Sequence, residues 1–160
     1  MADLKLHLGR TYWLTLLKEL HDRGHDRHES GAFLLGHVDG DRRFAETVVF
    51  YDDLDRDAYA SGVCILEGDS FEQLWSHCRT TGLSVIADIH THGGRAVQSC
   101  EDRQNPMIAR SGHLALIVPN FARDHVWRHH LGLYQYRGSH QWHDLSGWRS
   151  RTILKTGTWR

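Results

Sequence analysis

The chain has 160 residues, of which 40% are hydrophobic and 24% are charged, and its formal charge is −1. This length predicts one domain, spanning residues 1–160, that can bury a real core. The near-neutral charge argues against a nucleic-acid-binding module, and no segment has the roughly 20 apolar residues of a membrane span. Because the first residues also lack the apolar core of a signal peptide, we expect a cytoplasmic protein with neither nucleic acid nor membrane as a partner.

The N-terminal part predicts a helix followed by a β-hairpin. Apolar residues at helical spacing predict an amphipathic helix over residues 10–23, with Gly24 as its stop. Two apolar runs, "ESGAFLLGHV" (29–38) and "RRFAETVVFY" (42–51), flank the turn "DGD". Apolar runs on either side of an Asp-Gly turn are typical of a hairpin.

The next part predicts a loop, a short strand and a second helix. The acidic stretch "YDDLDRDAYA" (51–60) indicates a loop, and "SGVCILEG" (61–68) indicates a short strand. An apolar face within "FEQLWSHCRTTG" (71–82) predicts a helix that Asp69 or Ser70 could cap.

Two buried strands come next, because short β-branched runs bounded by turn residues favour strands. They are "LSVIADIH" (83–90) and "HLALIVPN" (113–120). The chain between them begins with a polar loop, and Pro106 then favours the start of one or two helical turns over "PMIARSG" (106–112).

The C-terminal part alternates apolar and polar residues, which is typical of strands. We expect strands in "HLGLYQYRG" (130–138) and "HQWHDLSGW" (140–148), joined at a Gly138-Ser139 turn. The last segment, "RTILKTGTWR" (151–160), fits either an edge strand or a partner-binding tail. The whole pattern predicts one α+β domain, with a central mixed β-sheet flanked by helices.

Three potential metal ligands follow the apolar run "LSVIA". His90 and His92 are one residue apart, so their side chains point the same way if the strand reaches residue 92. After a loop of nine residues, Asp102 can return as a third ligand. Two imidazoles and one carboxylate, with a fourth position open for water, are typical of a catalytic zinc site. We therefore predict Zn²⁺ as the cofactor, bound by these three residues.

Hydrolysis at such a site also needs a proton carrier and a group that stabilises the oxyanion. Glu29 is at the start of an apolar strand, where burying a charge without a partner would cost free energy. We therefore take Glu29 as the candidate general base. Ser99 could donate a hydrogen bond to the oxyanion. Each residue has a structural alternative: Glu29 could be a solvent-exposed strand start, Ser99 a turn residue, and Asp102 a helix cap.

Two neighbouring residues are ambiguous. Asp88 lies two positions before His90, and it either orients a ligand histidine or is solvated or paired in the core. Cys100 follows Ser99 directly, but no arrangement of histidine and asparagine beside it indicates a cysteine nucleophile.

The order Glu, then a distant His-x-His, then Ser-x-x-Asp resembles the JAMM signature of the JAB/MPN metalloprotease family. The matching residues are Glu29 in "HESGAFLLG", His90 and His92 in "DIHTHGG", and Ser99 and Asp102 in "SCED". The resemblance covers roughly residues 10–120. The family usually has proline after the second histidine, where this chain has Gly93-Gly94.

This resemblance implies a zinc-dependent isopeptidase or peptidase with a single cytidine-deaminase-like domain. It suggests a bacterial enzyme that cleaves the amide after the C-terminal tail of a ubiquitin-like protein, either as deconjugation or as precursor processing. Its expected partners are that protein and its conjugates, together with E1- and E2-like proteins of an anti-phage conjugation system. Sulfur-carrier proteins are another substrate class of related enzymes.

Two other classes of function remain. The first is a non-catalytic MPN-like scaffold that binds partner proteins, although such relatives usually lose the ligands that this chain retains. The second is a zinc deaminase, which would require His-x-Glu and a Pro-Cys-x-x-Cys pair. The sequence contains neither of these motifs.

Overall fold

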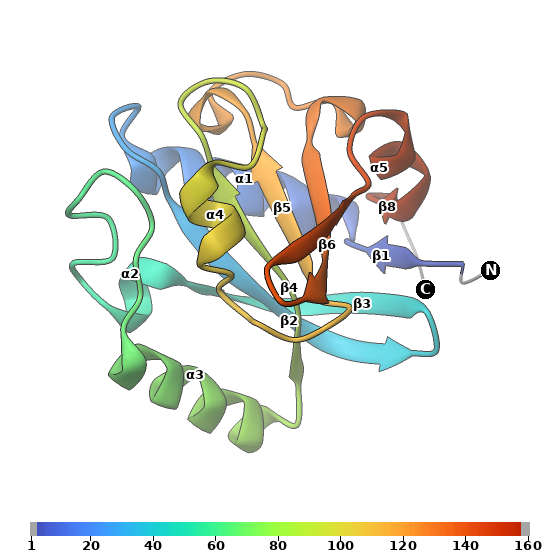
Figure 1. Ribbon diagram of the computed structural model, residues 1–160, viewed down its shortest axis with the longest axis horizontal. Coiled ribbons are helices and arrows are strands. Elements are labelled where there is room, and N and C mark those ends of the chain that lie inside the picture. Colours follow the sequence, from blue (N-terminus) through green and yellow to red (C-terminus); the bar gives the residue numbers. More distant parts are fainter. Residues whose placement is uncertain (1–2, 158–160) are drawn as a thin grey trace.

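An eight-stranded mixed β-sheet organises the structure, a computed structural model that describes residues 3–157 (Figure 1). Its strands are β1 (Lys5–His7), β2 (Gly31–Asp39), β3 (Arg42–Phe50), β4 (Ser84–Thr91), β5 (Leu114–Val118), β6 (Gly132–Gly138), β7 (Gln141–Asp144) and β8 (Leu154–Lys155). Their order is β7-β6-β5-β4-β2-β3-β1-β8. The pairs β4–β5, β1–β3 and β1–β8 are parallel, and the other neighbours are antiparallel.

Helices lie against this sheet, which confirms the α+β prediction. They are α1 (Arg10–Gly24), α2 (Tyr51–Leu54), α3 (Gly68–Thr81), α4 (Cys100–Gln104) and α5 (Trp148–Ile153), with short 3-10 turns η1 (Asn120–Ala122) and η2 (Arg128–His130). Within residues 3–157, none of the helices combines the length and the apolar character that a bilayer crossing requires.

The central strand β2 contributes to two hydrophobic cores, because successive side chains of a strand point to opposite faces. Ala32 and Leu34 belong to the core that includes Trp13, Leu16 and Leu20 of α1. Phe33 and Leu35 belong to the other core, which includes Leu74 of α3. The sheet is thus covered on both faces, and its central strands are held rigidly in register.

Most of the elements expected from periodicity are present. The predicted first helix corresponds to α1, the hairpin to β2–β3, and the two buried strands to β4 and β5. The C-terminal hairpin is β6–β7, with positive φ at Gly138 and Ser139 in its turn. The final segment forms the end of α5 and the two-residue edge strand β8, while its residues 158–160 lie outside the described residues.

Three local predictions are wrong, and two short elements were not expected: α2, at the start of the predicted loop of residues 51–60, and β1. Residues 61–68 form no strand but an irregular segment leading into α3, whose N-cap is Glu67 rather than Asp69 or Ser70. The helical turns lie before Pro106, in α4, since the cap residue Ser99 starts a helix there. Strand β1 was not expected, because three residues beside a parallel partner leave little periodicity to detect.

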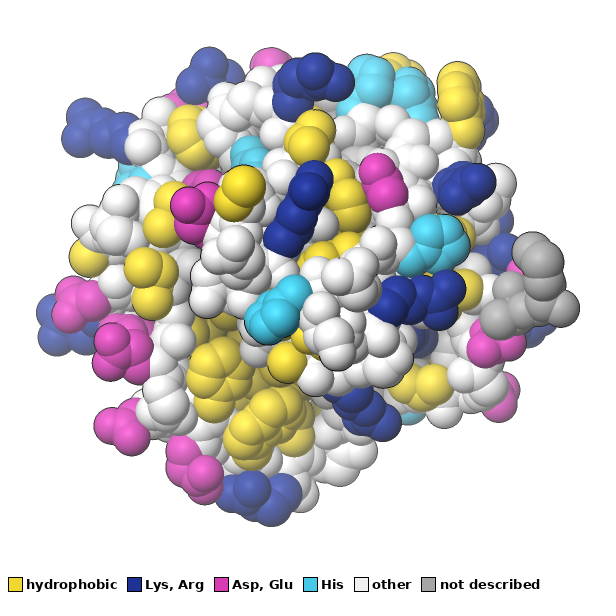
Figure 2. Space-filling view, in the orientation of Figure 1, with side chains coloured by type: hydrophobic (Ala, Val, Ile, Leu, Met, Phe, Trp, Pro, Cys, Tyr) yellow, Lys and Arg dark blue, Asp and Glu magenta, His cyan; other side chains and the backbone are white. Residues whose placement is uncertain are grey.

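Figure 2 shows the surface in the same orientation, with acidic side chains frequent along the side of α2 and α3.

Trp75 of α3 is partly exposed, although the spacing of apolar residues within 71–82 predicted that it would lie on the buried face of the helix. The neighbouring residues Leu74 and Cys78 pack inward as predicted.

Candidate metal centre

The carboxyl end of β4 presents two histidines on one side. His90 is the penultimate residue of the strand, and His92 follows its last residue. The Nε2 atoms of the two rings lie 3.0 Å apart. Thr91 points to the other side, where its Oγ1 accepts a hydrogen bond from Ser30 N at 3.0 Å. Strand geometry therefore fixes the histidine pair, as the His-x-His spacing predicted.

Asp102 reaches this pair from α4. Its Oδ1 lies 3.4 Å from His90 Nε2, and its Oδ2 lies 3.3 Å from His92 Nε2. Ligand atoms placed tetrahedrally at about 2.0–2.2 Å from one ion stand about 3.3–3.6 Å apart. The distances from the Asp102 oxygens to the two histidine nitrogens are therefore close to those between ligand atoms that share one ion.

Glu29 lies next to the same histidines because β2 and β4 pair antiparallel, with Gly31 opposite His90. Glu29 Oε1 is 3.7 Å from His92 Nε2, while Oε2 accepts a hydrogen bond from Cys64 N at 3.3 Å. Ligand atoms of Glu29, His90 and His92 all lie within 4.8 Å of one another, so they too form a group that could hold a metal ion. The histidine pair thus has one carboxylate close by and a second slightly farther away.

The two carboxylates occupy opposite electrostatic environments. Burial raises the pKa of Glu29, although His90, His92 and the Cys64 N–H oppose this shift. Burial also disfavours the charged form of Asp102, but its hydrogen bonds with the two histidines outweigh burial and hold the pKa of Asp102 well below its usual range. Asp102 is therefore suited to remain an anionic ligand, whereas Glu29 is suited to accept a proton.

Ser99 and Asp102 form a capping box at the start of α4. Ser99 Oγ accepts a hydrogen bond from Asp102 N at 3.0 Å, and Asp102 Oδ2 accepts one from Ser99 N at 2.7 Å. The helix-cap alternative is thus confirmed for Asp102, while Ser99, for which a turn was the alternative, is the N-cap residue itself. The same Asp102 carboxylate that caps the helix also contacts the two histidines, because the cap turns it toward them.

Asp88 is paired in the core and does not support a ligand histidine directly. Its Oδ1 lies 2.5 Å from His113 Nε2, and both side chains are almost fully buried. Of the two roles open to Asp88, the structure therefore shows the structural one. The partner His113 lies 25 residues further along the chain, directly before β5. Nothing in the sequence indicated that these two residues would pair.

A left-handed turn supports the backbone after His92. Asn120, Phe121 and Ala122 of η1 all have positive φ, between 51° and 55°. His92 O accepts a hydrogen bond from Phe121 N at 2.8 Å, and Gly94 O accepts one from Asn120 N at 3.0 Å. The Gly93-Gly94 pair is therefore held by backbone hydrogen bonds, despite the absence of proline.

Two contacts that support the site could not be predicted from the sequence. The Cys64 N–H that holds Glu29 is a backbone donor, and backbone donors leave no side-chain pattern. Phe121 is an ordinary apolar residue in the sequence, yet a Cβ added to Gly93 would lie 2.7 Å from its ring. Only the fold brings these residues to the histidines.

Comparisons with known proteins agree with a metal centre. No family model matches the sequence. The chain is 33% identical over 137 residues to a protein of Sinorhizobium fredii described as "Probable metalloprotease y4jG", covering 82% of this chain and 81% of that protein. The fold is similar to the solution structure of protein DSY2949 from Desulfitobacterium hafniense, with a TM-score of 0.64, 19% identity, and coverage of 94% and 93% of the two chains.

Proposed function

The chain belongs to the family of the probable metalloprotease y4jG, and from this premise we propose that it is a zinc-dependent peptidase of the JAB/MPN type. Its proposed substrate is the amide bond that follows the C-terminal tail of a ubiquitin-like protein. The observation that carries the proposal is the convergence of both carboxylates on the histidine pair, with Asp102 at 3.3–3.4 Å and Glu29 at 3.7 Å.

The donor set favours zinc held by His90, His92 and Asp102, since two imidazoles and one carboxylate are ligands that zinc prefers. When bound, zinc would polarise the scissile carbonyl and lower the pKa of a water molecule toward about 7. The more distant Glu29 is left free of the shell, with its Oε2 held by Cys64 N.

Glu29 would act as the general base and then as the general acid. Its raised pKa, caused by burial, favours acceptance of a proton from the attacking water. The same proton can pass to the amine as the carbon–nitrogen bond breaks. Ser99 Oγ accepts from Asp102 N, which leaves the hydroxyl hydrogen to donate to the oxyanion.

Exposed apolar side chains beside the site support a peptide substrate. Val63 and Ile65 flank the Cys64 N–H that binds Glu29, and they are 44% and 50% exposed. Val97 is exposed in the loop before Ser99. An extended tail lying between these two segments would contact apolar side chains on both sides. The small residues of such a tail would let it fit between the segments.

The proposal is tested with a fusion of a ubiquitin-like protein, through its C-terminal tail, to a reporter protein. The zinc-loaded enzyme should cut at the junction, as located by mass spectrometry, and should cut unstructured casein poorly. Cleavage within the reporter, or equal rates on casein, would contradict a tail-specific enzyme. Tight binding of the fusion without any cleavage would instead support the non-catalytic scaffold.

A further inference from the structure

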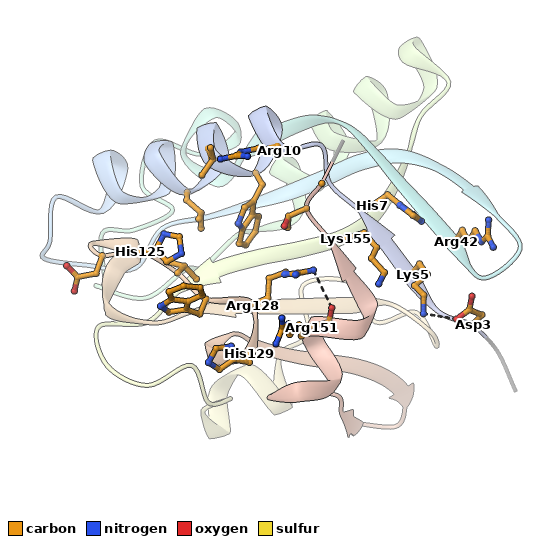
Figure 3. Close-up of a pocket in the computed structure, with 18 residues that line it drawn as sticks. Asp3, Lys5, His7, Arg10, Arg42, His125, Arg128, His129, Arg151 and Lys155 are labelled. Carbon is orange, nitrogen blue, oxygen red and sulfur yellow. Dashed lines mark hydrogen bonds and ion pairs between the residues drawn. The ribbon is translucent and has the colours of Figure 1, made fainter. Parts of the chain in front are cut away.

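A large cavity lies apart from the metal centre, on the side of the molecule where both termini lie (Figures 1 and 3). It is formed by the start of α1, the strand β1 with its neighbour β8 at the sheet edge, and residues 124–129. Its volume is about 1050 Å³, at the upper end of small-molecule pockets. None of the five proposed site residues is among its lining residues.

The lining of this cavity is strongly cationic, although the whole chain has a formal charge of −1. Its lysines and arginines are Lys5, Arg10, Arg42, Arg128, Arg151 and Lys155, and its acidic residues are Asp3 and Asp124. Lys5 pairs with Asp3 at 2.6 Å. Within residues 3–157, no ion pair joins Arg10, Arg42 or Lys155 to a carboxylate, although Asp3 interacts electrostatically with Arg42 and Lys155 at longer range.

The cations on one wall are held in place by the fold. Arg128 Nη1 donates to the carbonyl oxygens of Leu154 at 2.9 Å and Arg151 at 3.4 Å. The Arg151 guanidinium lies over the Trp148 ring, 5.5 Å from its centroid, and His129 stacks on the same ring at 4.8 Å. In Figure 3, Arg128 and Arg151 lie together in the middle of the view, with Arg10 on the helix above them. Such fixed cations lose little side-chain freedom on binding an anion.

The start of α1 adds to this positive field. Its N-cap, Gly9, makes no side-chain capping bond, and its first turn contains no acidic residue. The first N–H groups of a helix and its dipole favour an anion when they are not neutralised in this way. Arg10 is the first residue of this helix and lines the cavity.

An aromatic surface lies beside the cations. Trp127 lines the cavity and is 56% exposed, with His125 edge-on at a centroid distance of 4.5 Å. An exposed indole face can stack on a planar ring, as aromatic side chains stack on the bases of nucleic acids.

We propose that this cavity binds a nucleotide, in which phosphate groups are joined to a planar base. The phosphates would lie among Arg10, Arg151 and Lys155, and the base would stack on Trp127. A concave site bounded by β1, the edge strand β8 and a helix suits a single nucleotide, whereas a polymer requires a groove that extends across the surface.

Calorimetric titration of the zinc-loaded protein with ADP, pyrophosphate and adenosine tests the proposal. ADP should bind with a dissociation constant in the micromolar range, pyrophosphate at least about tenfold more weakly, and adenosine not measurably. Arg10→Gln and Lys155→Gln should each weaken ADP binding about tenfold, because each removes a charge-assisted hydrogen bond. Trp127→Ala should weaken ADP binding but leave pyrophosphate binding unchanged.

Arg79→Gln is the matched control, since Arg79 is an exposed arginine of α3 outside the cavity, and it should bind ADP as the parent protein does. Unchanged zinc content and melting temperature will establish that each variant is folded, and Arg151→Gln replaces any that is not. The absence of ADP binding, or equal weakening by Arg79→Gln, would overturn the proposal. Pyrophosphate binding as tight as ADP binding would show that the cavity binds anions without recognising a base, which would contradict a nucleotide site. Tighter binding of a single-stranded oligonucleotide would make it a nucleic-acid surface instead.

Discussion

His90 Nε2 and His92 Nε2 lie 3.0 Å apart at the end of β4, a distance at which two imidazoles share one proton or one metal ion. If both rings were protonated, their charges would repel at this separation. A metal ion between the two nitrogens lets both rings remain neutral and use both lone pairs. This pair is therefore the part of the site that depends most directly on metal.

The first prediction concerns metal content. Purified protein should hold about one zinc ion per chain, measured by elemental mass spectrometry, and His90→Ala should lose most of it because a tetrahedral shell then lacks a protein ligand. His77→Ala, at an exposed histidine of α3, is the control and should keep its zinc. Equal zinc in both variants, or none in the parent protein from zinc-replete cells, would contradict the site.

The second prediction concerns Glu29. Glu29→Gln keeps an oxygen that can accept the Cys64 N–H, but the amide cannot take up a proton. Zinc content should be unchanged, while the turnover number on the fusion substrate should fall by about 10²-fold or more. Glu67→Gln, an exposed neighbour of α3, should be fully active. Turnover by Glu29→Gln at the parent rate would remove Glu29 from the mechanism.

The third prediction concerns the cysteines. Cys100 is exposed, whereas burial raises the pKa of the Cys64 thiol, so iodoacetamide near neutral pH should label Cys100 first. Labelled protein and Cys100→Ser should stay active, because water and not a thiolate is the proposed nucleophile. A chelator should abolish activity. Peptide mapping and activity assays measure these effects, and the opposite pattern of inhibition would indicate a cysteine mechanism.

The fourth prediction compares two adjacent glycines. A Cβ at Gly93 would lie 2.7 Å from the Phe121 ring, so Gly93→Ala must displace that ring and disturb the backbone after His92. At Gly94 an added Cβ meets nothing within 4 Å. Zinc affinity, measured by competition with a chromogenic chelator, should therefore fall about tenfold in Gly93→Ala and stay unchanged in Gly94→Ala. Equal affinities in the two variants would show that Phe121 does not support the metal loop.

The fifth prediction concerns the buried pair of Asp88 and His113. Asp88→Ala leaves the His113 ring without its partner, so the free energy of unfolding should fall by about 2 kcal/mol or more. Chemical denaturation with urea measures this change, and the exposed Asp41→Ala should alter stability little. Zinc content should survive in both variants, since Asp88 hydrogen-bonds His113 rather than a ligand histidine. Loss of zinc without loss of stability would instead show that Asp88 supports the metal ligands.

Local backbone geometry made part of the site readable from the sequence. The side chains of His90 and His92 share a side because a strand has a period of two residues, and Ser99 and Asp102 meet because a capping box joins the N-cap to the third helical residue. The same periodicities identified α1, the β2–β3 hairpin and β4. The prediction of a metal site rested on the strand period of the histidine pair, whereas the pairing of Ser99 with Asp102 in a capping box was not predicted.

Longer-range contacts were decided only by the tertiary structure. Glu29 reaches His92 because β2 and β4 pair in one register, and a shift of one residue would turn it to the other face. The irregular course of residues 61–68, which places Cys64 N on Glu29, overrode a local preference for strand. The cations of the second cavity come from segments as far apart as Lys5 and Lys155. Such groupings follow from strand order and packing, because these bring together residues whose separation in sequence carries no periodic signal.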